Sequence, residues 1–171
     1  MCIRDRPNVE NYNPYFKTYI DKVPGDDILL KMGDKTPLDI YKQISSEKWD
    51  YRYAEGKWSI KEVMMHILDT ERIFAYRALR ISRGDQTALP GFDQNDYVPS
   101  YRAASRSIES LLDEYTSTRQ SSLKMFENFD HDHFTQVGTA GESKTSVLSL
   151  AFMIVGHEIH HLGLLKEKYH I

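Results

Sequence analysis

The stretch GHEIHHLGLL, residues 156–165, decides the fold because it combines three histidines with the pattern of a buried helix. These are three of the seven histidines of the chain, and they fall within five residues. From Val147 onward, apolar residues recur at the spacing of a helix with a broad apolar face. If Val147 takes an a position of a heptad, His157 falls at d and His161 at a, so both histidines face the core.

The spacing of His157 and His161 suits two ligands of one metal ion. On a helix the two residues share a face and lie about 6 Å apart along the axis. Imidazole nitrogens bind zinc at about 2.0 Å, so the two rings can converge on one ion. A single histidine on an apolar face is most often a hydrogen-bonded core residue, but burying two adjacent imidazoles without a shared partner costs desolvation twice. We therefore predict that this pair binds a metal.

A third ligand is expected from the remaining histidines. His66 fits best, because it lies within a predicted helix able to pack against the last one. His160 points about 100° away from His161, which suits a neighbouring or substrate-facing role. The others are expected in solvated or terminal positions: His131, His133 and His170. Three neutral histidines without a fourth protein ligand form an open site, for which zinc or nickel is expected first, with iron or manganese as alternatives.

The rest of the chain predicts an all-α fold, a four-helix bundle with long connections. Ser59 and Glu62 form a capping box ahead of a helix over residues 60–83, and apolar periodicity predicts another over 101–126. Residues 26–44 predict a first bundle helix broken at Gly33 and Pro37, preceded by a short helix over 14–23. The long connections span 85–100 and 130–144, and no convincing strand pattern occurs.

Length and composition are those of one soluble domain. The 171 residues are expected to form an N-terminal tail over 1–11 and a single domain over 12–171. The tail opens with MCIRDR, which resembles translated sequencing-adapter sequence, so residues 1–6 are a candidate non-native extension. Cys2 is the only cysteine of the sequence, which excludes an internal disulfide and a thiolate metal cluster.

Charge and hydropathy argue against nucleic-acid and membrane partners. The net charge of −3 offers no basic surface for phosphates. No apolar run approaches the roughly 18 residues of a membrane helix, and the N-terminus lacks the pattern of a signal peptide. We expect a cytoplasmic protein.

A protease is a weaker interpretation of the same histidines. The sequence HEIHH, residues 157–161, matches the zincin pattern of two histidines flanking a glutamate base. The glycine that turns the chain in metzincins is absent, since Leu164 occupies its place. Glu158 is then expected to be an orienting or packing-edge carboxylate.

Two further groups of residues have a structural and a functional interpretation. The loop around Phe92 is either a rigid aromatic-anchored connection or a lid that brings Asp93, Asp96 or Tyr97 near the open metal position. Arginines in the second long helix are most often solvated, and Arg77 or Arg80 is the candidate for holding an anionic substrate group.

Four ordered segments resemble the DinB-like superfamily, which includes YfiT-type metal-dependent hydrolases and bacillithiol S-transferases. They are YAEGKWSIKEV at 53–63, HILDTER at 66–72, PGFD at 90–93 and GHEIHH at 156–161. The resemblance spans about residues 12–169 and implies a four-helix bundle of unusual connectivity, often dimeric, with a divalent metal on three histidines. These match His66, His157 and His161. The break at Gly33 and Pro37 departs from the expected continuous first helix.

The resemblance leaves two classes of function open. The first is a metalloenzyme, expected as a homodimer, that activates a low-molecular-weight thiol for S-transfer or a water for hydrolysis of a small-molecule substrate. Asp93, Tyr97 and His160 are its catalytic candidates. The second is a non-catalytic, stress-associated metal-binding scaffold. A pocket sealed by Phe92 and Tyr97 favours the scaffold, whereas an open cleft with polar groups favours the enzyme.

Overall fold

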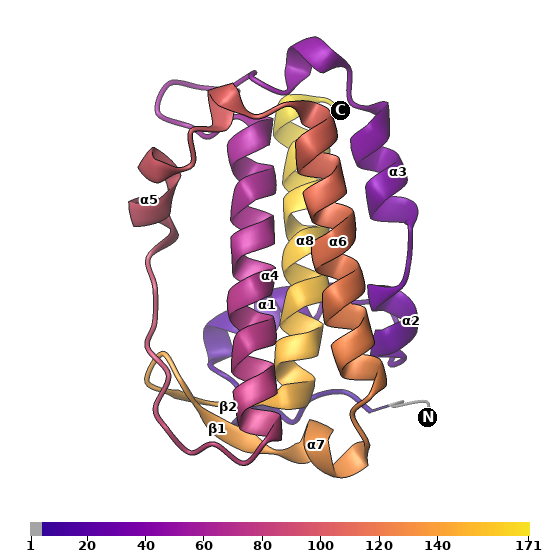
Figure 1. Ribbon diagram of the computed structural model, residues 1–171, viewed down its shortest axis with the longest axis vertical. Coiled ribbons are helices and arrows are strands. Elements are labelled where there is room, and N and C mark those ends of the chain that lie inside the picture. The colour runs from indigo at the N-terminus through magenta and orange to yellow at the C-terminus, as the bar shows by residue number, and fades with distance from the viewer. Residues whose placement is uncertain (1–4) are drawn as a thin grey trace.

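Long helices lying side by side form the protein in a computed structural model that describes residues 5–171 (Figure 1). The centre consists of α4 (Ile60–Ser82), α6 (Ile108–Glu127) and α8 (Val147–Tyr169), and α3 (Thr36–Gln43) packs on the outer side of α6. In Figure 1, α4 and α6 run downward whereas α3 and α8 run upward, so the chain between α4 and α6 returns along the bundle. The predicted four-helix bundle is confirmed.

The helix starts follow from their capping residues. The backbone amide of Ser59 donates to Glu62 Oε2 at 2.7 Å, and the amide of Glu62 donates to Ser59 Oγ at 3.3 Å, which is the predicted capping box of α4. At the start of α8, Ser146 Oγ accepts from the amide of Ser149 at 3.1 Å. These caps satisfy amides that have no partner within the helix.

The first bundle helix is broken, as predicted, into α2 (Ile28–Met32) and α3. The helix expected over 14–23 is shorter: a 3₁₀ turn at Pro14–Phe16 leads into α1 (Lys17–Ile20). Residues 1–4, including Cys2, lie outside the described residues, as does most of the candidate extension. Arg6 is described, and its guanidinium donates to the carbonyls of Ile20 at 2.7 Å and Val23 at 3.1 Å.

The predicted start of the third long helix was wrong. The third long helix begins at Ile108 rather than Tyr101, because Ser107 caps it and Arg102 adopts a left-handed φ of 49° that a helix excludes. The preceding connection contains α5 (Gln94–Tyr97). Further 3₁₀ turns lie at Val9–Asn11, Ser46–Lys48, Val98–Ser100 and Ala103–Ser105.

The expectation that no strand occurs was also wrong. Residues 130–144, predicted as a loop, contain α7 (His131–Thr135) and lead into an antiparallel hairpin of β1 (Val137–Ala140) and β2 (Ser143–Ser146). Gly141 and Glu142 form its turn with φ values of +57° and +68°. The strands lack a clear apolar alternation, so the turn residues were the only available signal. Leu89 pairs with Ala140 and ties the long connection to the hairpin.

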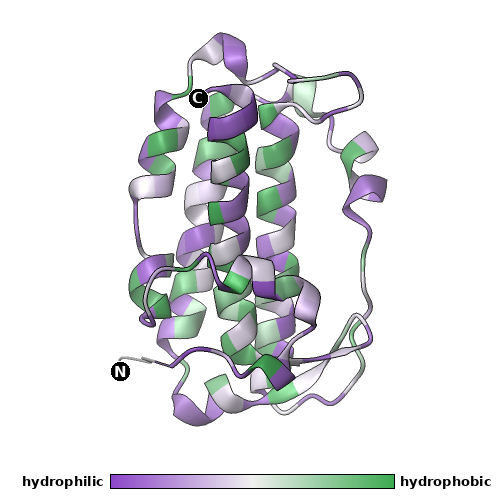
Figure 2. Cartoon of the chain, turned by 180° about the vertical axis from the view of Figure 1, so that it is seen from behind, coloured by the Kyte–Doolittle hydropathy of each residue, from purple (hydrophilic) through white to green (hydrophobic). Residues whose placement is uncertain are grey.

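The core is divided into two apolar clusters along the bundle axis. The lower cluster includes Phe74 of α4 and Phe126 of α6, and the upper one includes Met64 and Leu111. Apolar residues form bands along the long helices in Figure 2. Between the two clusters lies a buried polar layer: His66, Thr70, Glu71, Arg119, His157, Glu158 and His161. The bundle therefore buries this group of charged and titratable side chains together at mid-height.

Helix α8 is long and apolar enough, by length and composition, to cross a membrane, contrary to the expectation from its sequence. However, 72% of its most apolar window is buried inside the bundle. The central helix of a packed core accounts for this composition.

The backbone of another segment approaches α8 closely at Gly156. Helix α1 crosses α8 on the face turned toward the viewer in Figure 2. A Cβ atom added at Gly156 would lie 2.1 Å from the carbonyl oxygen of Tyr19 and 2.6 Å from its carbonyl carbon. Since a backbone carbonyl cannot rotate away like a side chain, only glycine permits this crossing.

We predict that Gly156→Ala lowers the free energy of unfolding by about 2 kcal/mol or more, because α1 must move off α8. The matched control is Gly163→Ala in the same helix, where an added Cβ meets nothing within 4 Å. That variant is expected to gain up to about 1 kcal/mol from helix propensity. Urea unfolding of both variants measures the difference, and equal effects would contradict the close crossing.

Candidate metal centre

Three buried histidines converge at mid-height of the bundle. His66 comes from α4, and His157 and His161 lie one turn apart on α8. The Nε2 atom of His157 lies 2.9 Å from Nε2 of His66 and 3.0 Å from Nε2 of His161. One ligand atom from each residue lies within 4.8 Å of the others. The structure therefore brings together the three residues that the sequence selected.

Burial keeps these imidazoles neutral. Desolvation, followed by repulsion from neighbouring histidines, lowers the pKa of His66 to about 4 and that of His161 to about 3. The same causes, burial first, hold the pKa of His157 well below its usual value. Neutral imidazole is the form that binds a metal.

The arrangement of the three Nε2 atoms suits metal coordination better than hydrogen bonding between the imidazoles. A neutral imidazole carries one ring proton, so a hydrogen bond between two Nε2 atoms leaves the Nδ1 of the donor ring as an acceptor. His161 Nδ1 is buried and has no hydrogen-bond partner among the described residues. Converging Nε2 lone pairs repel unless a cation lies between them. The donor set matches a divalent ion that accepts imidazole, with room for a further ligand.

Aromatic rings hold the imidazoles in place. The ring of Tyr19 packs edge-on against His157, with centroids 5.4 Å apart, and against His160 at 5.2 Å. The centroid of the Trp58 indole lies 5.1 Å from that of the His66 ring. Because Tyr19 belongs to α1, the close crossing at Gly156 also positions one wall of the centre.

A buried ion cluster fastens the two ligand-bearing helices to α6. Arg119 of α6 donates from Nε and Nη2 to Glu71 of α4, at 3.1 and 2.8 Å. Its Nη2 also lies 2.9 Å from Glu158 Oε2 on α8. Although burial alone lowers the pKa of Arg119, Glu158 and Glu71 raise it well above its usual value. The guanidinium therefore stays charged and holds α4 and α8 in register.

The Glu158 carboxylate therefore makes its contacts away from the histidine centre. Besides Arg119, it accepts a hydrogen bond from the Tyr41 hydroxyl at 3.3 Å. A zincin protease needs this glutamate as a base facing the metal, which the ion pair precludes. Sequence reasoning missed Glu71 and Arg119. The available signal was that Arg119 falls on the apolar stripe of its helix, four residues after Tyr115.

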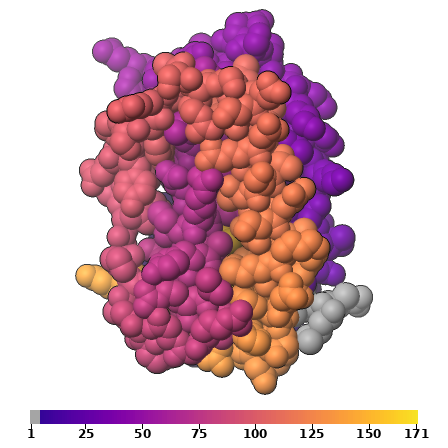
Figure 3. All heavy atoms as spheres, in the orientation of Figure 1, coloured from indigo at the N-terminus to yellow at the C-terminus, as the bar shows by residue number. Residues whose placement is uncertain are grey.

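A cleft of about 350 Å³ leads from the surface to the histidines. It lies between α4 and the connection over 85–100, where Figure 3 shows the surface hollowed. His66 and His157 border it. Aromatic rings supply much of its wall, and the polar side chains are Asn13, Thr70, Arg77 and Gln94. This volume falls within the range of small-molecule sites.

The connection contributes different residues to the cleft from those predicted. Phe92 and Gln94 line it, whereas Asp93 and Tyr97 do not. Asp93 is used as the cap of α5, where its Oδ1 accepts from the amide of Asn95 at 2.8 Å. Tyr97 packs its ring 5.6 Å from Phe92 and is 37% exposed.

The remaining arginine and histidine candidates differ in whether they lie at the cleft or the histidine trio. Arg77 lines the cleft, whereas Arg80 pairs with Asp85 outside it. His160 is half-buried beside Tyr19 and does not join the trio. The other histidines lie elsewhere: His133 in the capping box of α7, His131 exposed on α7 and His170 exposed after α8.

Three buried histidines, two of which border a cleft, make this four-helix bundle a helical protein with a candidate metal centre. The family model of the DinB superfamily matches residues 38–165, and the chain belongs to this superfamily. The resemblance found in the sequence is thereby confirmed. Among solved structures, the chain is similar to YfiT from Bacillus subtilis, which is described as a probable metal-dependent hydrolase with an unusual four-helix bundle topology. The TM-score is 0.69 with 12% identity, over 95% of this chain and 92% of that one, which establishes a shared fold.

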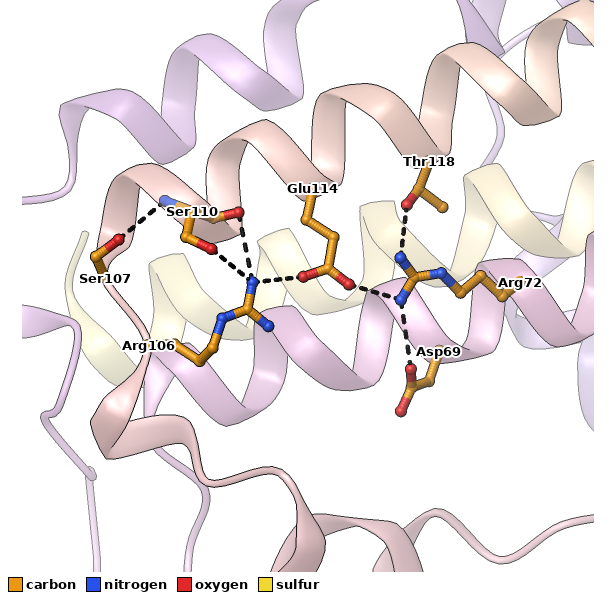
Figure 4. A network of polar contacts seen from close by, with 7 residues as sticks. All are labelled: Asp69, Arg72, Arg106, Ser107, Ser110, Glu114 and Thr118. Atoms are coloured by element: carbon orange, nitrogen blue, oxygen red, sulfur yellow. Dashed lines mark hydrogen bonds and ion pairs between the residues drawn. The ribbon is translucent and has the colours of Figure 1, made fainter.

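A second, partly exposed ion network joins α4 and α6 near the buried cluster (Figure 4). Arg72 Nη1 lies 2.7 Å from Glu114 Oε1, and Arg106 Nη2 lies 2.6 Å from Glu114 Oε2. The Arg72 side chain is 48% exposed, against 8% for Arg119. Arg72 and Arg119 both connect α4 to α6, Arg72 in a partly exposed environment and Arg119 in a buried one.

We predict that Arg119→Met lowers the free energy of unfolding by about 3–5 kcal/mol, because it leaves two buried carboxylates uncompensated. Arg72→Met is the matched control and should cost less than about 1 kcal/mol, since solvent screens its ion pairs. Denaturant unfolding compares them. Equal losses would show that the buried cluster contributes no more than the exposed network.

Proposed function

We propose that this protein is an enzyme whose divalent metal ion is held by His66, His157 and His161 and acts on a small molecule bound in the cleft. The observation that carries the proposal is the convergence of three neutral Nε2 atoms beside an open cleft that His66 and His157 border. The likeness to YfiT, described as metal-dependent, supports it. Zinc or nickel suits three imidazoles best, with iron or manganese as alternatives.

A divalent metal in such a site lowers the pKa of a thiol or water bound to it and so supplies a nucleophile. The chain supplies orientation and exclusion of water. Phe74 and Phe92 cover apolar parts of a substrate, and the side-chain amides of Asn13 and Gln94 offer donors and acceptors to its polar parts. Tyr19 and Trp58 keep the imidazoles from turning away.

Transfer to or from a low-molecular-weight thiol is the version we propose first. Among the described residues, no carboxylate lines the cleft to serve as a general base. A free thiol has a pKa of about 8.5, against about 15.7 for water, so a thiol needs less help to ionise. The aromatic wall suits an apolar electrophile. Hydrolysis is the second version, and the likeness to YfiT, which is described as a probable metal-dependent hydrolase, favours it.

The shape of the cleft favours an enzyme rather than a non-catalytic metal-binding scaffold. Phe92 and Tyr97 do not seal the approach to the histidines, because about 350 Å³ remains open beside Phe92. Polar side chains line this space, as expected for substrate binding. A cytoplasmic location and a homodimer remain predictions from the sequence and the resemblance.

We predict that wild-type protein purified and loaded with zinc retains about one ion per chain, and that His161→Ala loses most of it. His131→Ala is the control, since His131 is exposed on α7. Elemental analysis gives the metal content, and conjugation of cysteine to 1-chloro-2,4-dinitrobenzene tests thiol transfer. Full metal content in His161→Ala would overturn the centre. Metal binding without conjugation or ester hydrolysis would favour the scaffold.

A further inference from the structure

We infer that Arg77 binds a carboxylate of the substrate, so that the cleft selects extended anionic molecules with one end at Arg77 and the other at the histidines. This inference rests on the proposed function for the role of the histidine end. The binding of the carboxylate itself depends only on Arg77 and the cleft.

Arg77 is a buried cation without a carboxylate. Its residue exposure is 7%, the same as that of Arg119, and these are the two buried arginines of the described chain. Arg119 contacts two glutamates. No ion pair to Arg77 occurs within residues 5–171, where its one hydrogen bond runs from Nη2 to the carbonyl oxygen of Pro90 at 2.7 Å. Burying a guanidinium is costly unless an anion compensates it, so the missing partner is expected from outside the chain.

The guanidinium is held in a fixed orientation within the cleft. Its central carbon lies 5.8 Å from the ring centroid of Phe74 and 5.8 Å from that of Phe92. With Pro90, these contacts connect Arg77 to both walls, α4 and the long connection. A guanidinium held this way loses little conformational freedom on binding a planar carboxylate, which it matches with parallel donors.

The residues that line the cleft carry one permanent charge, and it is positive. Of the residues that line it, Arg77 is the only one with a permanent charge, and no aspartate or glutamate joins it among those described. Burial lowers the pKa of Arg77, which records the cost of this uncompensated charge. A neutral substrate would leave the buried guanidinium without an anion, whereas a carboxylate would compensate its charge.

The placement of Arg77 on α4 sets the length of the ligand. Arg77 lies eleven residues after His66, so the two Cα atoms are about 16 Å apart along the axis and about 20° apart around it. Both side chains line the same cleft. Helical side chains lean toward the N-terminus, which brings the guanidinium nearer to His66. A ligand of several bonds between carboxylate and reacting group spans this distance.

The test is calorimetric titration of metal-free protein at pH 8 with hexanoate and with hexanamide, which differ in charge and little in shape. We predict that hexanoate binds wild type at least about tenfold more tightly than hexanamide. Arg77→Gln should abolish the difference, and Arg77→Lys should retain part of it. Arg80→Gln is the matched control and should behave as wild type, because Arg80 pairs with Asp85 outside the cleft.

Equal affinity of wild type for the acid and the amide would overturn the inference, and this comparison does not depend on any variant folding. A preference for hexanoate that survives in Arg77→Gln, with an unchanged circular dichroism spectrum, would also overturn it. Because the titration uses metal-free protein, its outcome is separate from that of the metal centre. Loss of zinc binding would refute the proposed function and leave the preference for hexanoate in place.

Discussion

The ion pairs of Arg119 with Glu71 and Glu158 are the interaction on which the rest of the structure depends. They lie between two apolar clusters, at a level where the bundle buries charge, and they connect the three central helices to one another. A buried guanidinium with two carboxylates has few acceptable arrangements, so it fixes the rotation of α4 and α8. That rotation points His66 toward His157 and His161 on the opposite side of the same layer.

The polar layer thus has a closed half and an open half. In the closed half, Arg119 pairs with two glutamates, and the Tyr41 hydroxyl donates to one of them. The open half contains three neutral imidazoles and borders a cleft between α4 and the long connection, which extends along α4 to Arg77. In the first half, the charged partners come from the protein itself, whereas we propose that a cation binds at the histidines of the second half and an anion at Arg77. The candidate site therefore lies in one half of a layer whose other half holds the helices together.

Much of this could be predicted from the sequence, because local rules govern it. The capping box at Ser59 and the four-residue spacing of His157 and His161 depend on neighbouring residues alone. The hairpin at 137–146 escaped prediction because its strands have no clear apolar alternation. The partners of Arg119 and the isolation of Arg77 could not be predicted, since both arginines look alike on a helix until three helices are packed. Asp93 was a catalytic candidate, but its carboxylate caps α5. The sequence alone does not distinguish a capping carboxylate from a catalytic one.

X-ray absorption at the zinc K-edge of the loaded protein tests the central claim most directly, since it reads the ligand shell itself. We predict three imidazole rings with nitrogen at about 2.0–2.1 Å and at least one further light-atom ligand from outside the chain. A shell with fewer than three imidazoles, or one completed by a protein carboxylate, would contradict a three-histidine centre open to the cleft.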